Sequence, residues 1–317
     1  MMKSLKFTVL MLLSGAILLA AGLTIEARNP LAIQRANEVV ALDWKALQGV
    51  VKNITPENAR VVSSKGKVLL SQPVDNDGDG AVDQLLFVAD FGADDEKKFE
   101  IKADSLLEIP DVEARAYARY VPERKDDFAW ENDVIAFRAY GPALIKSTEN
   151  CGFDCFMKRV KYPILDKWYK RAFKIPSYHK DIGEGHDGYK VGSSLGCGGS
   201  AVWYKGKMYR SNVYSSWKKF ANGPIRAVFE LTYGPWEVDG RQITEKKLIS
   251  IDLGSRMFKV NDSFFANGKP AKLDVVVGLT THGGDADAYE NQKDGWIYCW
   301  DKIDKHYLGT GILVSPM

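Results

Sequence analysis

Short segments in which apolar and polar residues alternate recur along most of this chain. In Ile225–Tyr233, for example, Arg226 and Glu230 fall on one face, while Ile225, Ala227 and Phe229 fall on the other. Turn residues separate most of the segments, at Asn222-Gly223-Pro224, Asp239-Gly240, Asn267-Gly268 and Asp294-Gly295. The pattern predicts strands at Lys67–Gln72, Gln84–Phe91, Lys97–Lys102, Val112–Val121, Asp133–Tyr140, Ile225–Tyr233, Ile243–Leu253, Met257–Phe265, Leu273–Thr281, Trp296–Trp300 and Leu308–Val314.

Many strands joined by hairpin turns, with few helices, predict an all-β fold, an antiparallel β-sandwich or a barrel. The best helix candidate is Cys155–Lys170, which Pro163 interrupts. The chain shows neither an internal repeat nor a low-complexity linker. We therefore expect residues 28–317 to form a single domain.

The first residues have the pattern of a secretory signal peptide. Lys3 and Lys6 precede an apolar stretch from Phe7 to Leu23, and the chain turns polar at Glu26. Residues 1–27 are assigned to this signal, with cleavage after Ala21, Gly22 or Ala27; a retained membrane anchor is the alternative. We expect a periplasmic or secreted protein with no stable membrane anchor after cleavage.

Composition narrows the choice of partner. The formal net charge is +2 with both signs mixed along the chain, which gives no reason to propose nucleic acid as a partner. Aromatic residues make up 11% of the chain. In an exported protein this fits stacking on sugars, although aromatic residues that fill a β core explain it as well.

Four cysteines in an oxidising compartment allow three pairings. Cys151 and Cys155 are close enough in sequence for a local disulfide. Cys197 and Cys299 either pair across the fold or remain buried thiols.

A glycine-rich segment at residues 176–199 carries much of the chain's candidate chemistry. It contains two of the four histidines, His179 and His186, together with Tyr178, Asp181, Glu184, Asp187 and Tyr189. Its glycines argue against a core strand or regular helix, and imidazole and phenol groups serve as proton donors and acceptors. We expect a long surface loop with one His and one Tyr in acid–base roles; a transition-metal site and solvated histidines are the alternatives.

Acidic residues alternate between Asp75 and Asp83. Carboxylates at Asp75, Asp77 and Asp79, followed by Gly80 and Asp83, place oxygen ligands on a tight loop, as a structural Ca²⁺ site requires. The residue at the position of a bidentate Glu in an EF-hand is Leu86. An acidic turn without a ligand is the alternative, and no other cofactor is expected.

Arginine occurs within two of the predicted strands. Arg138 shares a face with Tyr140, and Arg226 shares a face with Glu230. A guanidinium held on a rigid strand can bind a carboxylate or sulfate through two hydrogen bonds. The alternative is an arginine that pairs with a glutamate on a solvated sheet face.

Several separated blocks resemble one family. They are residues 135–144 (Ile-Ala-Phe-Arg-Ala-Tyr-Gly-Pro-Ala-Leu), 165–169 (Leu-Asp-Lys-Trp-Tyr), 177–179 (Ser-Tyr-His), 183–192 (Gly-Glu-Gly-His-Asp-Gly-Tyr-Lys-Val-Gly) and 221–226 (Ala-Asn-Gly-Pro-Ile-Arg). The aspartate loop before residues 84–87 also looks like the N-terminal part of that family. The chain resembles a family of unknown-function domains found in polysaccharide-utilisation systems, whose described activity is that of an ulvan oligosaccharide dehydratase.

The resemblance implies a supersandwich related in shape to galactose mutarotases. It also implies further strands beyond Met317, so that this chain would complete the sandwich only in part. The implied reaction removes water from a non-reducing-end uronic acid of an acidic oligosaccharide by β-elimination. A mutarotase, an epimerase, a hydrolase or a non-catalytic glycan-binding module is the alternative.

Such an elimination needs a cation at the carboxylate, a base for the C5 proton and an acid for the departing hydroxyl. We assign the cation to Arg138 or Arg226, and the base and acid to His179 and Tyr189 in either order. The expected substrate-binding residues are Arg226, Asp187 and the aromatic residues Trp168, Tyr214 and Trp217.

Overall fold

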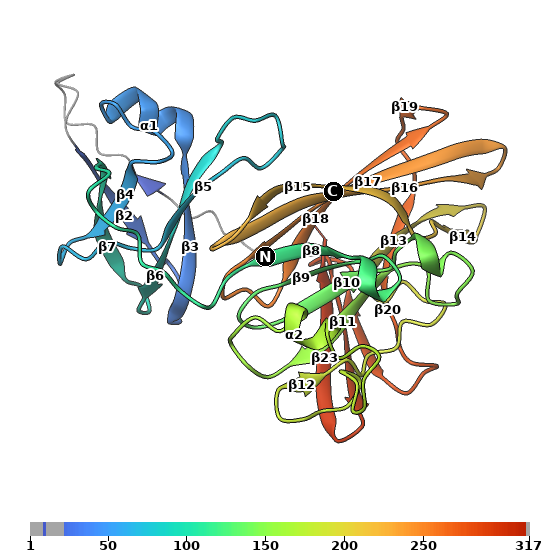
Figure 1. Cartoon of the computed structure of the whole chain (residues 1–317). Helices are drawn as coiled ribbons and strands as arrows, with labels where there is room; N and C mark the ends of the chain where they lie inside the picture. Colours follow the sequence, from blue (N-terminus) through green and yellow to red (C-terminus); the bar gives the residue numbers. More distant parts are fainter. Residues whose placement is uncertain (1–8, 11–21, 315–317) are drawn as a thin grey trace.

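The structure, a computed structural model, describes residues 9–10 and 22–314, and strands dominate them (Figure 1). The all-β prediction is confirmed. In the first third lie β1 (Val9–Leu10), β2 (Gly22–Arg28), β3 (Arg35–Asp43), α1 (Trp44–Val50), β4 (Ala59–Ser63), β5 (Ser71–Val74), β6 (Gln84–Phe91) and β7 (Glu96–Ala103). Next come β8 (Tyr117–Val121), β9 (Asp127–Glu131), β10 (Ala136–Ala139), β11 (Phe153–Lys158), α2 (Leu165–Tyr169), β12 (Gly185–His186), β13 (Cys197–Tyr204) and β14 (Lys207–Arg210). The remainder comprises β15 (Tyr214–Asn222), β16 (Arg226–Val238), β17 (Arg241–Asp252), β18 (Phe258–Ala266), β19 (Lys269–Pro270), β20 (Val275–Leu279), β21 (Asp287–Asn291), β22 (Trp296–Ile303) and β23 (His306–Leu313), with 3-10 turns at Pro122–Arg124 and Pro142–Leu144.

Strands β2, β3, β4, β6 and β7 and helix α1 enclose a core of their own, on the left of Figure 1. Two antiparallel sheets build it, ordered β1-β2-β7-β4 and β3-β6-β5. Ile25, Leu85, Phe87 and Ile101 are buried between the sheets, and Leu47 of α1 covers one end of this core.

The larger core lies between the sheet β15-β16-β17-β18-β19 and the sheet β12-β11-β10-β9-β8. Its centre is aromatic: the ring of Trp130 lies 5.2–5.8 Å from the rings of Phe137, Phe153, Phe229 and Phe258. Part of the high aromatic content therefore fills a β core, which the sequence offered as the alternative to stacking on sugars.

The two cores meet where the β3-β6-β5 sheet packs against β16. Val74 and Leu86 from the first part are buried with Ile225 and Val228 from the second. Burial of these four side chains holds the two parts together.

The hairpin turns agree with the sequence prediction. At Asp239-Gly240 and at Asn267-Gly268 both residues have positive φ, the geometry that two-residue turns between antiparallel strands require. The helix candidate at Cys155–Lys170 was wrong in its first half. Its residues 155–158 belong to β11, a strand whose side chains are all buried, and helix begins only at Leu165, after Pro163.

The glycine-rich segment also differs from the expectation. Cys197, Gly198 and Gly199 open β13, where the register shifts at a bulge. Gly199 has a packing reason, because a Cβ there would lie 2.6 Å from Gly152 Cα. Glycine is therefore used here for close contact between backbones.

Most of the predicted signal peptide lies outside the described residues. Its last part is β2, which begins at Gly22 and buries Ile25 and Ala27 in the first core. Of the three cleavage positions, the one after Ala21 leaves β2 whole, the one after Gly22 removes its first residue, and the one after Ala27 removes nearly all of it. Within the described residues, no helix combines the length and the apolar character needed to span a bilayer.

Candidate functional site

The segment from Ser177 to Tyr189 supplies β12, the edge strand of the β8–β12 sheet, and most of its chemical groups are buried. Tyr178, Glu184, His186 and Asp187 are buried. Among its candidate groups, His179 is the one whose side chain remains half exposed. The segment is mostly loop, as expected, but most of its candidate polar side chains are buried rather than solvated.

Arg138 in β10 lies at the centre of a buried charge cluster beneath this segment. Its guanidinium donates hydrogen bonds to Asp154 of β11, to Asp187 at 2.9 Å and to the Tyr178 hydroxyl at 2.9 Å. Asp127 of β9 lies 3.7 Å away. Neighbouring strands bring Asp127 and Asp154 to Arg138, because Arg138 pairs directly with Asp154 and with Ala129 in the sheet.

This placement changes the role expected of Arg138. Its side chain is buried, and two protein carboxylates, those of Asp154 and Asp187, already engage its Nη2. It is therefore not a free clamp for a substrate carboxylate. Its contacts instead hold Tyr178 and Asp187 in place, and both of these residues contact the His179 ring.

The cluster contains three carboxylates, those of Asp127, Asp154 and Asp187. It contains two arginines, because Arg124 joins Arg138 by pairing with Asp127 at 3.1 Å. Burial disfavours the charged form and raises the pKa of Asp127 to about 6 and that of Asp154 to about 7. Burial likewise raises the pKa of Asp187. The cluster therefore retains protons at a pH where exposed aspartates have lost them.

His179 contacts this cluster through one ring nitrogen. Its Nδ1 lies 3.2 Å from the Asp187 carbonyl oxygen and 3.3 Å from the Asp187 carboxylate, and its ring packs on Tyr178 with centroids 4.4 Å apart. Both Asp187 atoms are acceptors, so Nδ1 carries the proton and Nε2 keeps its lone pair. Partial burial, together with the charges of Arg138 and Arg124, lowers the pKa of His179. The result is a neutral imidazole with an available basic nitrogen.

Arg124 was missed by the sequence analysis. It ends the 3-10 turn between β8 and β9, is partly exposed and pairs on one side with Asp127. Its charge is close enough to depress the pKa of His179. The signal in the sequence is the run Arg124-Lys125-Asp126-Asp127, which looks like an ordinary polar turn.

Tyr189 lies apart from the group around His179. Its hydroxyl donates a hydrogen bond to the Gly196 carbonyl oxygen at 3.0 Å, and its ring packs edge-on against His282 at 4.9 Å. Burial raises the pKa of Tyr189 far above that of a free phenol. The phenol beside the guanidinium is therefore Tyr178 rather than Tyr189.

The other two histidines lie where the β22–β23 hairpin reaches the glycine-rich segment beside β12: His186 belongs to the segment and His306 to the hairpin (Figure 1). His186 Nε2 lies 3.1 Å from Asp304, and His306 Nε2 lies 3.6 Å from Asp181. All four histidines of the chain thus contact the glycine-rich segment or belong to it. No group of three metal ligands forms among them in the described part of the chain.

The three aromatic candidates have different surroundings. Trp168 is buried, stacks on Phe156 and donates to Glu184 at 3.2 Å. Tyr214 is buried and donates to the Asp126 carbonyl oxygen. Trp217 is 40% exposed and stacks on Tyr120, so only this ring offers a surface to a sugar.

Arg226 serves the junction between the two cores. It forms two hydrogen bonds to Asp252, at 2.6 and 2.8 Å, and contacts Asn76 and Gln84 of the first part. None of these residues contacts Arg138, and this arginine is not brought to the His179 group. The substrate role expected of Arg226 has no support from its contacts.

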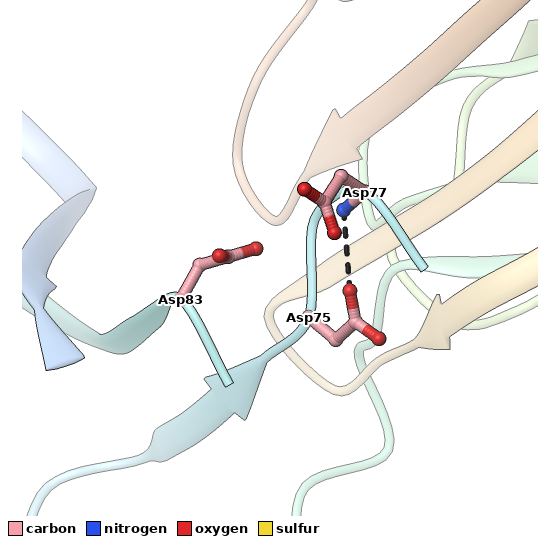
Figure 2. A group of neighbouring side chains, drawn as sticks. All are labelled: Asp75, Asp77 and Asp83. Carbon is pink, nitrogen blue, oxygen red and sulfur yellow. Dashed lines mark hydrogen bonds between the residues drawn. The ribbon is translucent and has the colours of Figure 1, made fainter. Parts of the chain in front are cut away.

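The aspartate loop lies between β5 and β6, and Figure 2 shows its side chains. The carboxylates of Asp75, Asp77 and Asp83 offer oxygens within 4.8 Å of one another. Asp79 is not part of this group; it accepts the Ala81 N–H at 2.8 Å. Oxygen ligands at this separation suit a hard cation, so a structural Ca²⁺ remains our proposal, with three of the four aspartates as ligands.

Calcium is expected to raise the melting temperature by about 5 °C at saturation, because a ligand that binds only the folded state stabilises it. Asp77→Asn is expected to remove this increment. Asp79→Asn is the matched control, because Asp77 and Asp79 are both exposed and each accepts one backbone N–H. Thermal unfolding with calcium and with chelator measures the effect. The same melting temperature for the wild type under both conditions would contradict the proposed calcium site.

Comparison with known proteins gives the family. Residues 27–317 match the family described as "Domain of unknown function (DUF4861)", and this chain belongs to it. A curated relative, "Uncharacterized protein P7" of Formosa agariphila, is 37% identical over 305 residues, which cover 92% of this chain and 75% of the relative.

A solved structure, that of an α-mannosidase from Enterococcus faecalis V583, aligns with a TM-score of 0.34 and 9% identity. The alignment covers 92% of this chain and 40% of the α-mannosidase. This likeness is too weak to bear on function.

Proposed function

We propose that this protein is a carbohydrate-active enzyme that removes water from a non-reducing-end uronic acid of an acidic oligosaccharide. The observation that supports the proposal most is the His179 imidazole, half exposed and held by a buried carboxylate, with Arg124 close by. A base next to a cation is what elimination beside a carboxylate needs.

In this proposal His179 serves as both base and acid. Nε2 takes the C5 proton, the C5–H electron pair forms the C4=C5 double bond, and the C4–O bond breaks. The imidazolium then returns the proton to the departing hydroxide, which leaves as water. Asp187 stabilises the imidazolium through Nδ1, as a carboxylate does for a catalytic histidine.

Arg124 is the proposed partner of the substrate carboxylate. Acidity at C5 rises when a cation offsets the charge that develops on the carboxylate. Asp127 engages one edge of the Arg124 guanidinium. Arg138 acts one layer deeper as a positioning residue, because it orients Asp187 and Tyr178 rather than the sugar.

Trp217 is linked to the β8–β9 turn through Tyr120. Its ring stacks on Tyr120, whose hydroxyl donates to Asp126, two residues after Arg124. An exposed indole beside such a turn suits the apolar face of a second sugar unit. A periplasmic or secreted location, which the signal peptide predicts, fits an oligosaccharide substrate.

The proposal predicts a new conjugated double bond. Saturated uronate-ended oligosaccharides incubated with the protein are expected to gain ultraviolet absorbance, and neutral-ended oligosaccharides are not. Arg124→Gln is expected to lower kcat/KM about 10²-fold, because it removes a charge from the transition state. Lys125→Gln, at the next position, is the control. A flat absorbance trace with several different uronates would contradict the proposal.

A further inference from the structure

Two cysteines from different strands meet beneath the site. Cys155 lies in β11 and Cys197 opens β13, and both side chains are buried in the larger core. An isolated bridge between Phe153 and Gly196 brings the two strands together at this point. Both residues line the same cavity of about 210 Å³, and the Cys197 thiol is close enough to raise the pKa of Cys155.

We propose that Cys155 and Cys197 form a disulfide when the protein folds in an oxidising compartment. No disulfide is present among the four cysteines in the structure. This pairing differs from a local Cys151–Cys155 disulfide, because Cys151 turns toward Ser211. Cys299 of β22 also lies near Cys197, and the refolding experiment below distinguishes the two partners. Sequence spacing could not reveal the Cys155–Cys197 pairing, since β11 and β13 become neighbours only through the fold.

The step is a thiol–disulfide exchange with a disulfide reagent such as glutathione disulfide or an exported oxidoreductase. The two thiols lose two protons and two electrons as the S–S bond forms, and the reagent is reduced to two thiols. The neighbouring Cys197 thiol, together with burial, raises the pKa of Cys155, so oxidation is expected during folding, before the core closes.

The position of this pair links it to the site. Residues 156–196 lie between the two cysteines and include α2, Tyr178, His179 and Asp187. A disulfide would therefore join both ends of the segment that carries the proposed base. Cross-linking restricts the unfolded chain and holds such a segment in place.

Refolding the full chain with glutathione disulfide, followed by digestion without reduction and mass spectrometry, tests the pairing. The expected product is a peptide containing Cys155 linked to one containing Cys197, with a mass lower by two hydrogens. Recovery of four free thiols, or of a Cys151–Cys155 or Cys197–Cys299 link, would overturn the inference.

Thermal unfolding provides a second measurement. The oxidised wild type is expected to melt on the order of 5 °C above the reduced protein. Cys155→Ser is expected to lose this difference, and Cys151→Ser, equally buried, to keep it. The same melting point for oxidised and reduced wild type would also count against the disulfide. Neither readout uses substrate, so failure here leaves the proposed reaction standing.

Discussion

Replacement of His179 with alanine is expected to lower kcat for elimination by about 10³-fold, within the range for loss of a general acid–base group. The imidazole is the group whose geometry supplies both a fixed tautomer and an open basic nitrogen. The change should leave folding intact, because the side chain is half exposed. Initial rates at saturating substrate, from the ultraviolet assay, measure the effect.

The control for this variant is Lys180→Ala, which removes a neighbouring exposed side chain. Substrate affinity of His179→Ala, measured by calorimetry, separates catalysis from binding. If the variant keeps at least a third of the wild-type rate, His179 is not the base. If the wild type binds the oligosaccharide without turnover, the protein is a glycan-binding module.

Arg138→Met is expected to lower the free energy of unfolding by about 3–5 kcal/mol, the cost of removing one partner from a buried ion pair. Three carboxylates would then remain with Arg124 as their only nearby arginine. Arg256→Met, at an exposed position, is the control and should change the free energy by less than about 0.5 kcal/mol. Urea unfolding measures both variants.

The pH dependence of the Arg138→Met variant follows from the carboxylates. Asp127 and Asp154 already have folded pKa values of about 6 and about 7, above the ordinary 3.8. The folded state therefore holds more protons than the unfolded chain, and this contribution to stability falls as pH rises from about 4 to about 7. Without Arg138 these pKa values rise further. The variant's loss in free energy of unfolding, relative to the wild type, should therefore be larger at pH 7.5 than at pH 5.

An equal deficit at the two pH values would show that the loss comes from packing alone. A deficit under about 1 kcal/mol at both would contradict the charge cluster itself, because a buried guanidinium with two carboxylate partners cannot be removed so cheaply. The pH series therefore separates the electrostatic account from a simple cavity.

The sequence predicted the strands best where alternation and turn residues agreed. Gln84–Phe91 was predicted with the bounds of β6, and the Asp239-Gly240 and Asn267-Gly268 turns were found in place. The alternation pattern failed to predict a strand that is buried on both faces. β11 shows no alternation because all its side chains are buried, so its residues looked helical.

The site was predicted in part. The sequence identified His179, Asp187 and Arg138, and the structure brings these three together. It could not tell that Arg138 binds Asp154 and Asp187, because those contacts depend on which strands become neighbours. For the same reason the sequence could not decide between sugar stacking and a core role for Trp168 and Tyr214, which are core residues, and Arg124 went unnoticed.

The most direct test of the proposed reaction is the mass of the product formed from a single uronate-ended oligosaccharide. Dehydration predicts one product whose mass equals that of the substrate less one water, with no smaller fragment. A hydrolase would give fragments that together contain one added water, and an epimerase or mutarotase would leave the mass unchanged. Either of those results, or an intact substrate after prolonged incubation, would contradict the assignment of His179 as the base of an elimination.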